Sequence, residues 1–223
     1  SGQQVTSGSQ QVLIGAYAGD ALTTGAQNVA IGYKALTGED TGNKNIAIGT
    51  NALEALNYNG DGYNVAVGHD AGKLISSGLY NTIVGGGAAD ALTTGSYNVA
   101  IGKSALSAED TGNYNTAIGY FALNNLNNTT GHNTAIGFDA GKSMTDGYYS
   151  VLIGSEAGEA LTTSYGNVAI GKDALKTEDT GSRSVAIGFN TLTAQDSSSS
   201  TPYNVAIGYN AGAAVTTGTL NTI

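Results

Sequence analysis

The pentapeptide Asn98-Val99-Ala100-Ile101-Gly102 decides the fold of this chain, because close variants of it recur from one end to the other. Most steps between successive motif glycines are 17 residues. Such a short fixed period is typical of a solenoid, in which each coil buries its apolar face only against its neighbours. The sequence therefore predicts twelve coils, whose motif glycines are Gly15, Gly32, Gly49, Gly68, Gly85, Gly102, Gly119, Gly137, Gly154, Gly171, Gly188 and Gly208.

A longer period lies on top of the first. Gly15, Gly85 and Gly154 are each followed by the text Ala-Leu-Thr-Thr, so four coils make a unit of roughly 70 residues. Residues 220–223 begin another copy of the motif, and we expect the chain to be a segment of a longer protein. Residues 1–10 are expected to be a lead-in linker, and residues 11–223 a single solenoid domain truncated within a repeat.

Composition narrows the possible functions. The 223 residues include 34 Gly, one Pro and no Cys, so disulfides and thiolate metal sites are excluded. The net charge of -9 argues against nucleic acid as a partner, because phosphate binding needs a clustered basic surface. No stretch is long and apolar enough to predict membrane insertion.

Within each motif, β-branched residues flank a small residue, which is typical of a short strand. Strands repeated in one direction predict an all-β parallel β-solenoid. If the flanking Val and Ile point into the coil, the small residues form an outer stripe, which we expect to be a subunit interface because the core is thin. In every fourth coil Leu13, Ile83 and Leu152 replace alanine and are expected to plug a wider gap in that interface. The stripe comprises Ala30, Ala47, Ala66, Ala100, Ala117, Ala135, Ala169, Ala186 and Ala206.

Asparagine stands four residues before the motif glycine in nine coils. Stacked amides can donate to one neighbouring coil and accept from the other, so we predict a structural ladder. Its members are Asn28, Asn45, Asn64, Asn81, Asn98, Asn115, Asn133, Asn167 and Asn204.

Aromatic residues form two further columns. One residue before the asparagine stand Tyr63, Tyr80, Tyr97, Tyr114, Tyr149 and Tyr203, with His132 as a substitute ring. Just after the motif glycine stand Tyr33, His69, Tyr120, Phe138, Phe189 and Tyr209. This second set is compatible with turn packing or with sugar rings lying flat on exposed side chains.

The run Asn115-Thr116-Ala117-Ile118-Gly119-Tyr120-Phe121-Ala122-Leu123 resembles a known repeat. It is similar to the head repeats of trimeric autotransporter adhesins, and more closely to repeat arrays in bacteriophage tail and capsid fibres. The resemblance covers essentially the whole chain. It implies a left-handed parallel β-roll, a homotrimer, attachment to a cell surface, and a location on a virion or on the outside of a cell. Other fibre or virion proteins are the further partners that it implies.

Enzyme chemistry is not expected. Asp40-Thr41-Gly42 and its copies resemble an aspartic protease signature, but they recur four coils apart, too far for two carboxylates to share a proton. Glu39-Asp40 and its copies lack the further oxygen ligands of a calcium site. The run of residues 68–73 has the wrong spacing for a P-loop. We therefore predict no catalytic residues, no metal and no cofactor.

We expect an attachment fibre whose binding is sugar-directed and carried by loops that lengthen the repeat, at residues 57–63, 124–132 and 194–203. The alternatives are a passive spacer, a bacterial adhesin head and an ice-binding solenoid, although threonines here are too irregular for a continuous ice-binding plane. The candidate binding residues are Tyr58, Asp61, Tyr63, Asn127, Asn128 and Tyr203.

Overall fold

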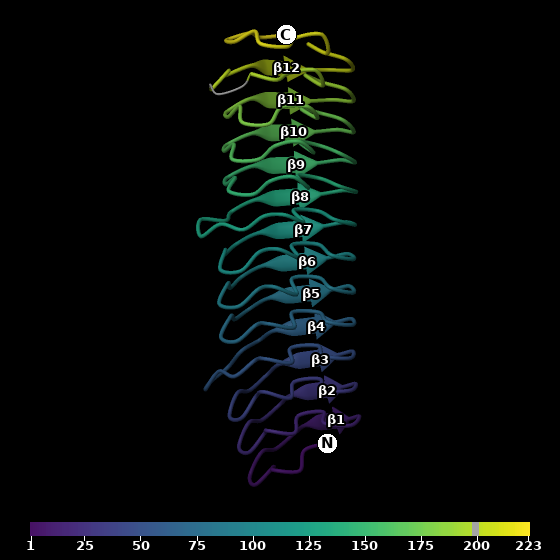
Figure 1. Cartoon of the computed structure of the whole chain (residues 1–223), viewed down its shortest axis with the longest axis vertical. Helices are drawn as coiled ribbons and strands as arrows, with labels where there is room; N and C mark the ends of the chain where they lie inside the picture. The colour runs from purple at the N-terminus through teal and green to yellow at the C-terminus, as the bar shows by residue number, and fades with distance from the viewer. Residues whose placement is uncertain (198–200) are drawn as a thin grey trace. The chain divides into compact units, whose positions relative to one another are not determined.

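The computed structural model describes residues 1–197 and 201–223, and they fall into two compact units, Ser1–Asn113 and Tyr114–Ile223. Every regular element of the described residues is a three-residue strand (Figure 1). The first unit contains β1 (Val12–Ile14), β2 (Val29–Ile31), β3 (Ile46–Ile48), β4 (Val65–Val67), β5 (Thr82–Val84) and β6 (Val99–Ile101). The second contains β7 (Thr116–Ile118), β8 (Thr134–Ile136), β9 (Val151–Ile153), β10 (Val168–Ile170), β11 (Val185–Ile187) and β12 (Val205–Ile207).

Within each unit, successive strands pair in parallel and in sequence order. The register places each motif directly on the next, as in the pairs Ala30 with Ala47 and Ala169 with Ala186. The predicted all-β parallel solenoid with coils of about 17 residues is therefore confirmed for both units.

The strand side chains face the opposite way from the prediction. The central alanine of each motif is fully buried, while the flanking β-branched residues are half-buried or exposed. The outward stripe predicted for the nine alanines is thus wrong, and so is their assignment to a subunit interface. The reason is space: the interior of so small a coil accepts a methyl group from the strand, whereas two larger branched side chains have no room there.

Large residues in the interior alternate between two places. Most coils with alanine in the strand carry a buried leucine four residues after the motif glycine, such as Leu53. Where the strand carries Leu152, glycines take that place, and an added Cβ at Gly141 or Gly158 would lie within 3 Å of a Leu152 methyl. Ile83 lies against Gly72 in the same way. Leu13, Ile83 and Leu152 therefore fill the inside of the coil and do not plug an interface.

The motif glycines are required by the close stacking of coils. At Gly68, φ is +143°, and an added Cβ would lie 2.5 Å from the carbonyl oxygen of Gly85 in the next coil. Both the backbone conformation and the contact exclude a side chain.

Residues 1–10 do not form the expected linker. The amide of Gly2 donates to the Ala18 carbonyl at 3.0 Å, and that of Thr6 donates to the Thr23 carbonyl at 2.9 Å. These residues thus follow the path of a coil before β1.

Candidate functional site

The outer face of the strands is a flat apolar surface. Each strand contributes two side chains, one on either side of the buried residue, and nearly all are Val or Ile. The end strands are the most exposed, with Ile14 of β1 58% exposed and Ile207 of β12 61% exposed, whereas nearly all the flanking side chains of the other strands are half-buried. We call these two rows of side chains the strand face. Such an uncovered apolar surface marks an interaction site in a water-exposed protein.

Behind the strand face lies the asparagine column, which is buried in both units. The amide nitrogen of Asn81 donates to the Oδ1 atom of Asn64 at 3.0 Å, and its Nδ2 donates to the carbonyl of Gly95 at 2.9 Å. In the second unit Ser150 and Ser184 take the place of asparagine. Their main-chain amides still donate to the Oδ1 atoms of Asn133 and Asn167 in the preceding coils, so the column continues through them. The side-chain oxygens therefore bind mainly main-chain N–H groups, and the amides are engaged in structure.

A buried carboxylate recurs in every fourth coil, at Glu39, Glu109 and Glu178. Each accepts a hydrogen bond at 2.7 Å from the amide of the glycine three residues later. Burial raises the pKa of Glu39 above its ordinary value of 4.5, and N–H donors led by Gly42 partly oppose the shift. These side chains anchor the turn of the Glu-Asp-Thr-Gly sequence.

Among the described residues, one cluster of three carboxylates has the spacing of a candidate cation site. Ligand atoms of Glu178, Asp179 and Asp196 lie within 4.8 Å of one another. However, the Glu178 carboxylate accepts hydrogen bonds from Gly181, from Gln195 at 2.9 Å and from the Ser197 hydroxyl at 2.8 Å. Its oxygens are used by the turn, and we assign no metal to it.

The residues five positions before each motif glycine form what we call the upstream edge. In the first unit the rings of Tyr63, Tyr80 and Tyr97 are stacked, with centroids 5.4 and 5.0 Å apart. Lys44 covers the end of the stack, because its Nζ lies 4.9 Å from the Tyr63 centroid and 2.8 Å from the Tyr63 hydroxyl. The hydrogen bond from Lys44 to Asp61 lowers the pKa of the Asp61 carboxyl.

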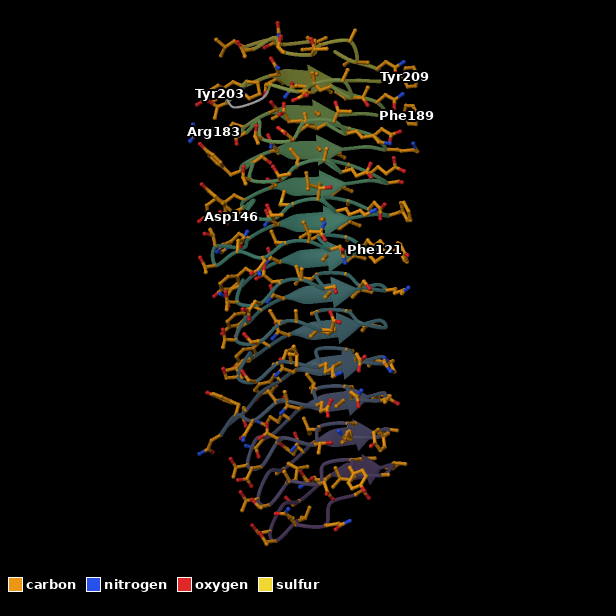
Figure 2. All side chains as sticks on the ribbon, in the orientation of Figure 1. Phe121, Asp146, Arg183, Phe189, Tyr203 and Tyr209 are labelled. Carbon is orange, nitrogen blue, oxygen red and sulfur yellow. The ribbon has the colours of Figure 1, made fainter. Side chains whose placement is uncertain are left out.

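The upstream edge of the second unit contains a cation within the column. Arg183 lies over both Tyr165 and Tyr203, 5.1 and 5.7 Å from the two centroids, and donates to the Tyr203 hydroxyl at 2.6 Å. Figure 2 shows Arg183 and Tyr203 on this edge, while Phe189 and Tyr209 lie on the opposite one. Phe189 and Tyr209 are stacked at 5.6 Å.

The six predicted binding residues are divided between the two units. Tyr58, Asp61 and Tyr63 belong to the first unit, whereas Asn127, Asn128 and Tyr203 belong to the second. Of the predicted loops, 57–63 and 124–132 are described throughout, and residues 198–200 of the third lie outside the described residues.

Several of those side chains are occupied. Tyr63 has Tyr80 on one face, and Lys44 lies over its ring and binds its hydroxyl. Asn128 is buried and accepts from the Gly131 amide at 2.7 Å. The predicted hydrogen bonds from Asn128 to a ligand are therefore wrong, because this side chain is buried and engaged within the coil. Tyr63 is 45% exposed, and its predicted sugar contact stays a prediction. Asn127 is exposed and stays a candidate.

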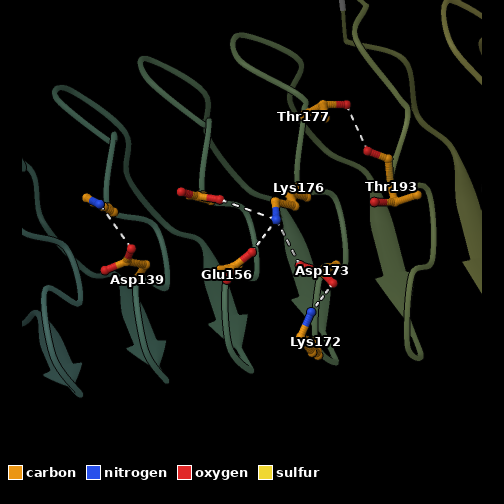
Figure 3. Close-up of polar contacts among 9 residues, drawn as sticks. Asp139, Glu156, Lys172, Asp173, Lys176, Thr177 and Thr193 are labelled. Carbon is orange, nitrogen blue, oxygen red and sulfur yellow. Dashed lines mark hydrogen bonds and ion pairs between the residues drawn. The ribbon is translucent and has the colours of Figure 1, made fainter.

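The opposite edge, formed by residues one to six positions after each motif glycine, we call the downstream edge. In the second unit it carries an ion cluster in which Lys176 contacts Glu156, Glu159 and Asp173 (Figure 3). The hydrogen bond to Glu156 is the main cause that raises the pKa of Lys176. In the first unit the matching place is an open hollow of about 430 Å³. Sequence reasoning missed this hollow, although Gly85-Gly86-Gly87 is a signal of missing side chains.

Comparison of the chain with protein-family models, with curated proteins and with solved structures gives no match. Across the part of the chain that the structure describes, no helix has the length and apolar character needed to cross a membrane.

Proposed function

We propose that this chain is a section of a homotrimeric fibre, of the kind found in phage tails and capsids, that takes part in attachment to a host-cell surface. The observation that carries the proposal is the strand face. An apolar surface repeated in every coil is best covered by the same surface of another copy, since each copy then gains the same contact in every coil. The number of copies, three, rests on the resemblance to trimeric fibres and adhesins.

The thin interior supports the same proposal. Each strand after β1 buries only one side chain, most often alanine, so the strands themselves contribute little apolar burial to a single chain. Association through the strand face would bury the Val and Ile side chains that are half-exposed in one chain. The interface proposed here consists of those Val and Ile residues, and it replaces the interface predicted from the alanines.

The mass of the purified chain in solution tests this interface. We expect three times the chain mass of 22.3 kDa by light scattering. Ile101→Glu places a charge on the strand face and should yield a folded monomer, because the buried alanine of the same strand is untouched. Thr94→Glu, at an exposed turn position, is the control and should remain trimeric. A wild-type mass of 22.3 kDa at micromolar concentration contradicts the proposal.

Attachment and passive spacing differ in one measurement. The labelled wild-type trimer is incubated with candidate host cells, and retention on the cells supports attachment. The engagement of Tyr63 and Asn128 within the coil favours the spacer as the second candidate function. Binding that requires a downstream domain would establish the spacer.

A further inference from the structure

The hollow on the downstream edge of the first unit spans the three coils of Gly68, Gly85 and Gly102. Its volume of about 430 Å³ lies in the range of small-molecule sites, roughly 300 to 1,000 Å³. Its lining combines polar side chains with apolar surface. It contains Asp70, Lys73, Leu74, Asp90, Ser107 and two alanines.

The same place in the second unit shows why the hollow exists. Positions 69 residues later carry Ser155, Glu156 and Lys176, whereas the first unit has Gly86, Gly87 and Ser107. The backbone is the same, since φ is +62° at Gly87 and +60° at Glu156. The hollow is therefore a loss of side chains and not a change of path.

Figure 3 shows the side chain that occupies the equivalent place, Lys176, between Glu156 and Asp173, and Lys176 also pairs with Glu159 at 3.8 Å. In the first unit the serine at 107 is too short to reach across, and its hydroxyl donates to Asp90 at 2.7 Å. The side chain that fills this place in the second unit is therefore missing from the hollow.

The chemistry of the hollow suits a hydroxylated ring. The Asp70 carboxylate accepts from Asn51 at 2.8 Å and lies 3.1 Å from His69 Nδ1, while the Asp90 carboxylate accepts from Ser107. A carboxylate has about four acceptor sites, so both retain some for a ligand. The Lys73 ammonium lies 3.7 Å from Asp70, a loose pair that leaves it donors for a ligand. Leu74 is 48% exposed and offers an apolar wall to the C–H face of the ring.

We propose that this hollow binds one sugar residue of a cell-surface polysaccharide. The proposal rests on the proposed attachment function and assigns its ligand class and its site. One hollow per chain gives three per trimer, and a polysaccharide that reaches several of them would gain avidity through effective concentration.

Ala91→Tyr is the variant that tests the site, because Ala91 lines the hollow and a ring at this position would fill it. Ala91 is only half-buried, so the larger side chain can lie outside the packed interior. Ala160→Tyr places the same ring at the equivalent position of the second unit, 69 residues later, and is the matched control. Asp90→Asn keeps an acceptor for Ser107 and removes the charge.

Wild type and variants are applied to a glycan array, and the affinity for the glycan that wild type binds best is then measured by calorimetry. We expect Ala91→Tyr to weaken binding about tenfold or more, Asp90→Asn to weaken it less, and Ala160→Tyr to leave it unchanged. Circular dichroism melts should be alike for all four proteins.

Two results overturn the proposal. Glycan binding that Ala91→Tyr leaves at the wild-type level shows that the sugar binds elsewhere. Binding to host cells with no glycan bound on the array removes the sugar ligand while the attachment function stands. If wild type binds neither cells nor glycans, the attachment function fails together with the site.

Discussion

The inside and the outside of the strands differ in a way that the sequence pattern alone leaves ambiguous. Inside stands a column of fully buried alanines, and outside stand two rows of larger Val and Ile side chains. Alternation of side chains along a strand shows that its two faces differ, but which face points inward depends on the space available on each side. Here the larger apolar residues of the strands are left outside. Most strands contribute only alanine to the interior, whose larger side chains come from buried leucines elsewhere in the coil, and the strand Val and Ile remain for association.

The largest loss of stability on the interior side is expected from Asn81→Leu. Its Oδ1 atom accepts from the Asn98 amide at 2.9 Å, and its Nδ2 donates to the Gly95 carbonyl. Leucine leaves both groups buried without these partners, at about 1 to 3 kcal/mol each. The free energy of unfolding is measured by chemical denaturation.

Asn81→Ser is the matched control, since Ser150 and Ser184 take the asparagine position in the second unit. It should recover part of the loss, because its hydroxyl can still accept a hydrogen bond. Equal stability of Asn81→Leu and wild type would contradict the assignment of the column to the buried interior.

The second prediction concerns the volume of the interior. Ala47→Leu crowds a coil that already contains Leu53, and we expect a loss of about 1 to 3 kcal/mol from overpacking. The triple change Ala47→Leu with Leu36→Gly and Leu53→Gly reproduces the arrangement of Leu152 with Gly141 and Gly158, and it should restore most of the stability. A triple mutant that is as unstable as the sum of its parts would show that these positions do not share space.

The period and the strand positions could be predicted from the sequence because every coil repeats the same strand motif. The direction of the side chains could not, since both Ala-in and Ala-out satisfy the alternation. The evidence for the correct choice was nevertheless present: Leu152 coincides with Gly158, and most alanine strands coincide with Leu53 or its equivalents. Such exchange of volume is expected only between residues that share one interior.

The candidate site was less accessible to sequence reasoning for a different reason. The predicted binding residues were chosen by residue type alone. Whether such a side chain is free depends on contacts between stacked coils, as between Lys44 and Tyr63, which are 19 positions apart in the chain. The hollow is defined by what Gly86, Gly87 and Ser107 lack relative to the second unit. It becomes visible only when the two units are superimposed in register.

A third prediction contrasts a buried with an exposed carboxyl. The pKa of Glu39 is raised in the folded state, so its contribution to stability is fully present below about pH 4.5 and is lost as the pH rises through the folded pKa. Relative to Glu39→Gln, wild type should lose stability from pH 4.5 upward. Thermal melts over a pH series measure this difference.

The pH dependence of stability at Asp61, tested by Asp61→Asn, should have the opposite sign. The pKa of Asp61 is lowered by Lys44, so that pair stabilises the fold above about pH 3.8 and its contribution disappears as the pH falls. The effect should be small, because the pair is exposed and screened by salt. Parallel pH profiles for Glu39→Gln and Asp61→Asn would contradict the assigned environments.

The smallest effect is expected on the outside, at the tyrosine column. Tyr80 is stacked between Tyr63 and Tyr97 but is 43% exposed, so replacement by alanine removes two ring contacts that water already surrounds. We expect a loss of about 0.5 to 1.5 kcal/mol in the free energy of unfolding. Tyr80→Phe keeps the stack and should be neutral. If Tyr80→Ala instead costs as much as Asn81→Leu, the column is buried in the protein as it exists in solution, and the covering surface must come from another copy of the chain. The stability of Tyr80→Ala therefore also reports whether the upstream edge lies inside or outside the proposed trimer.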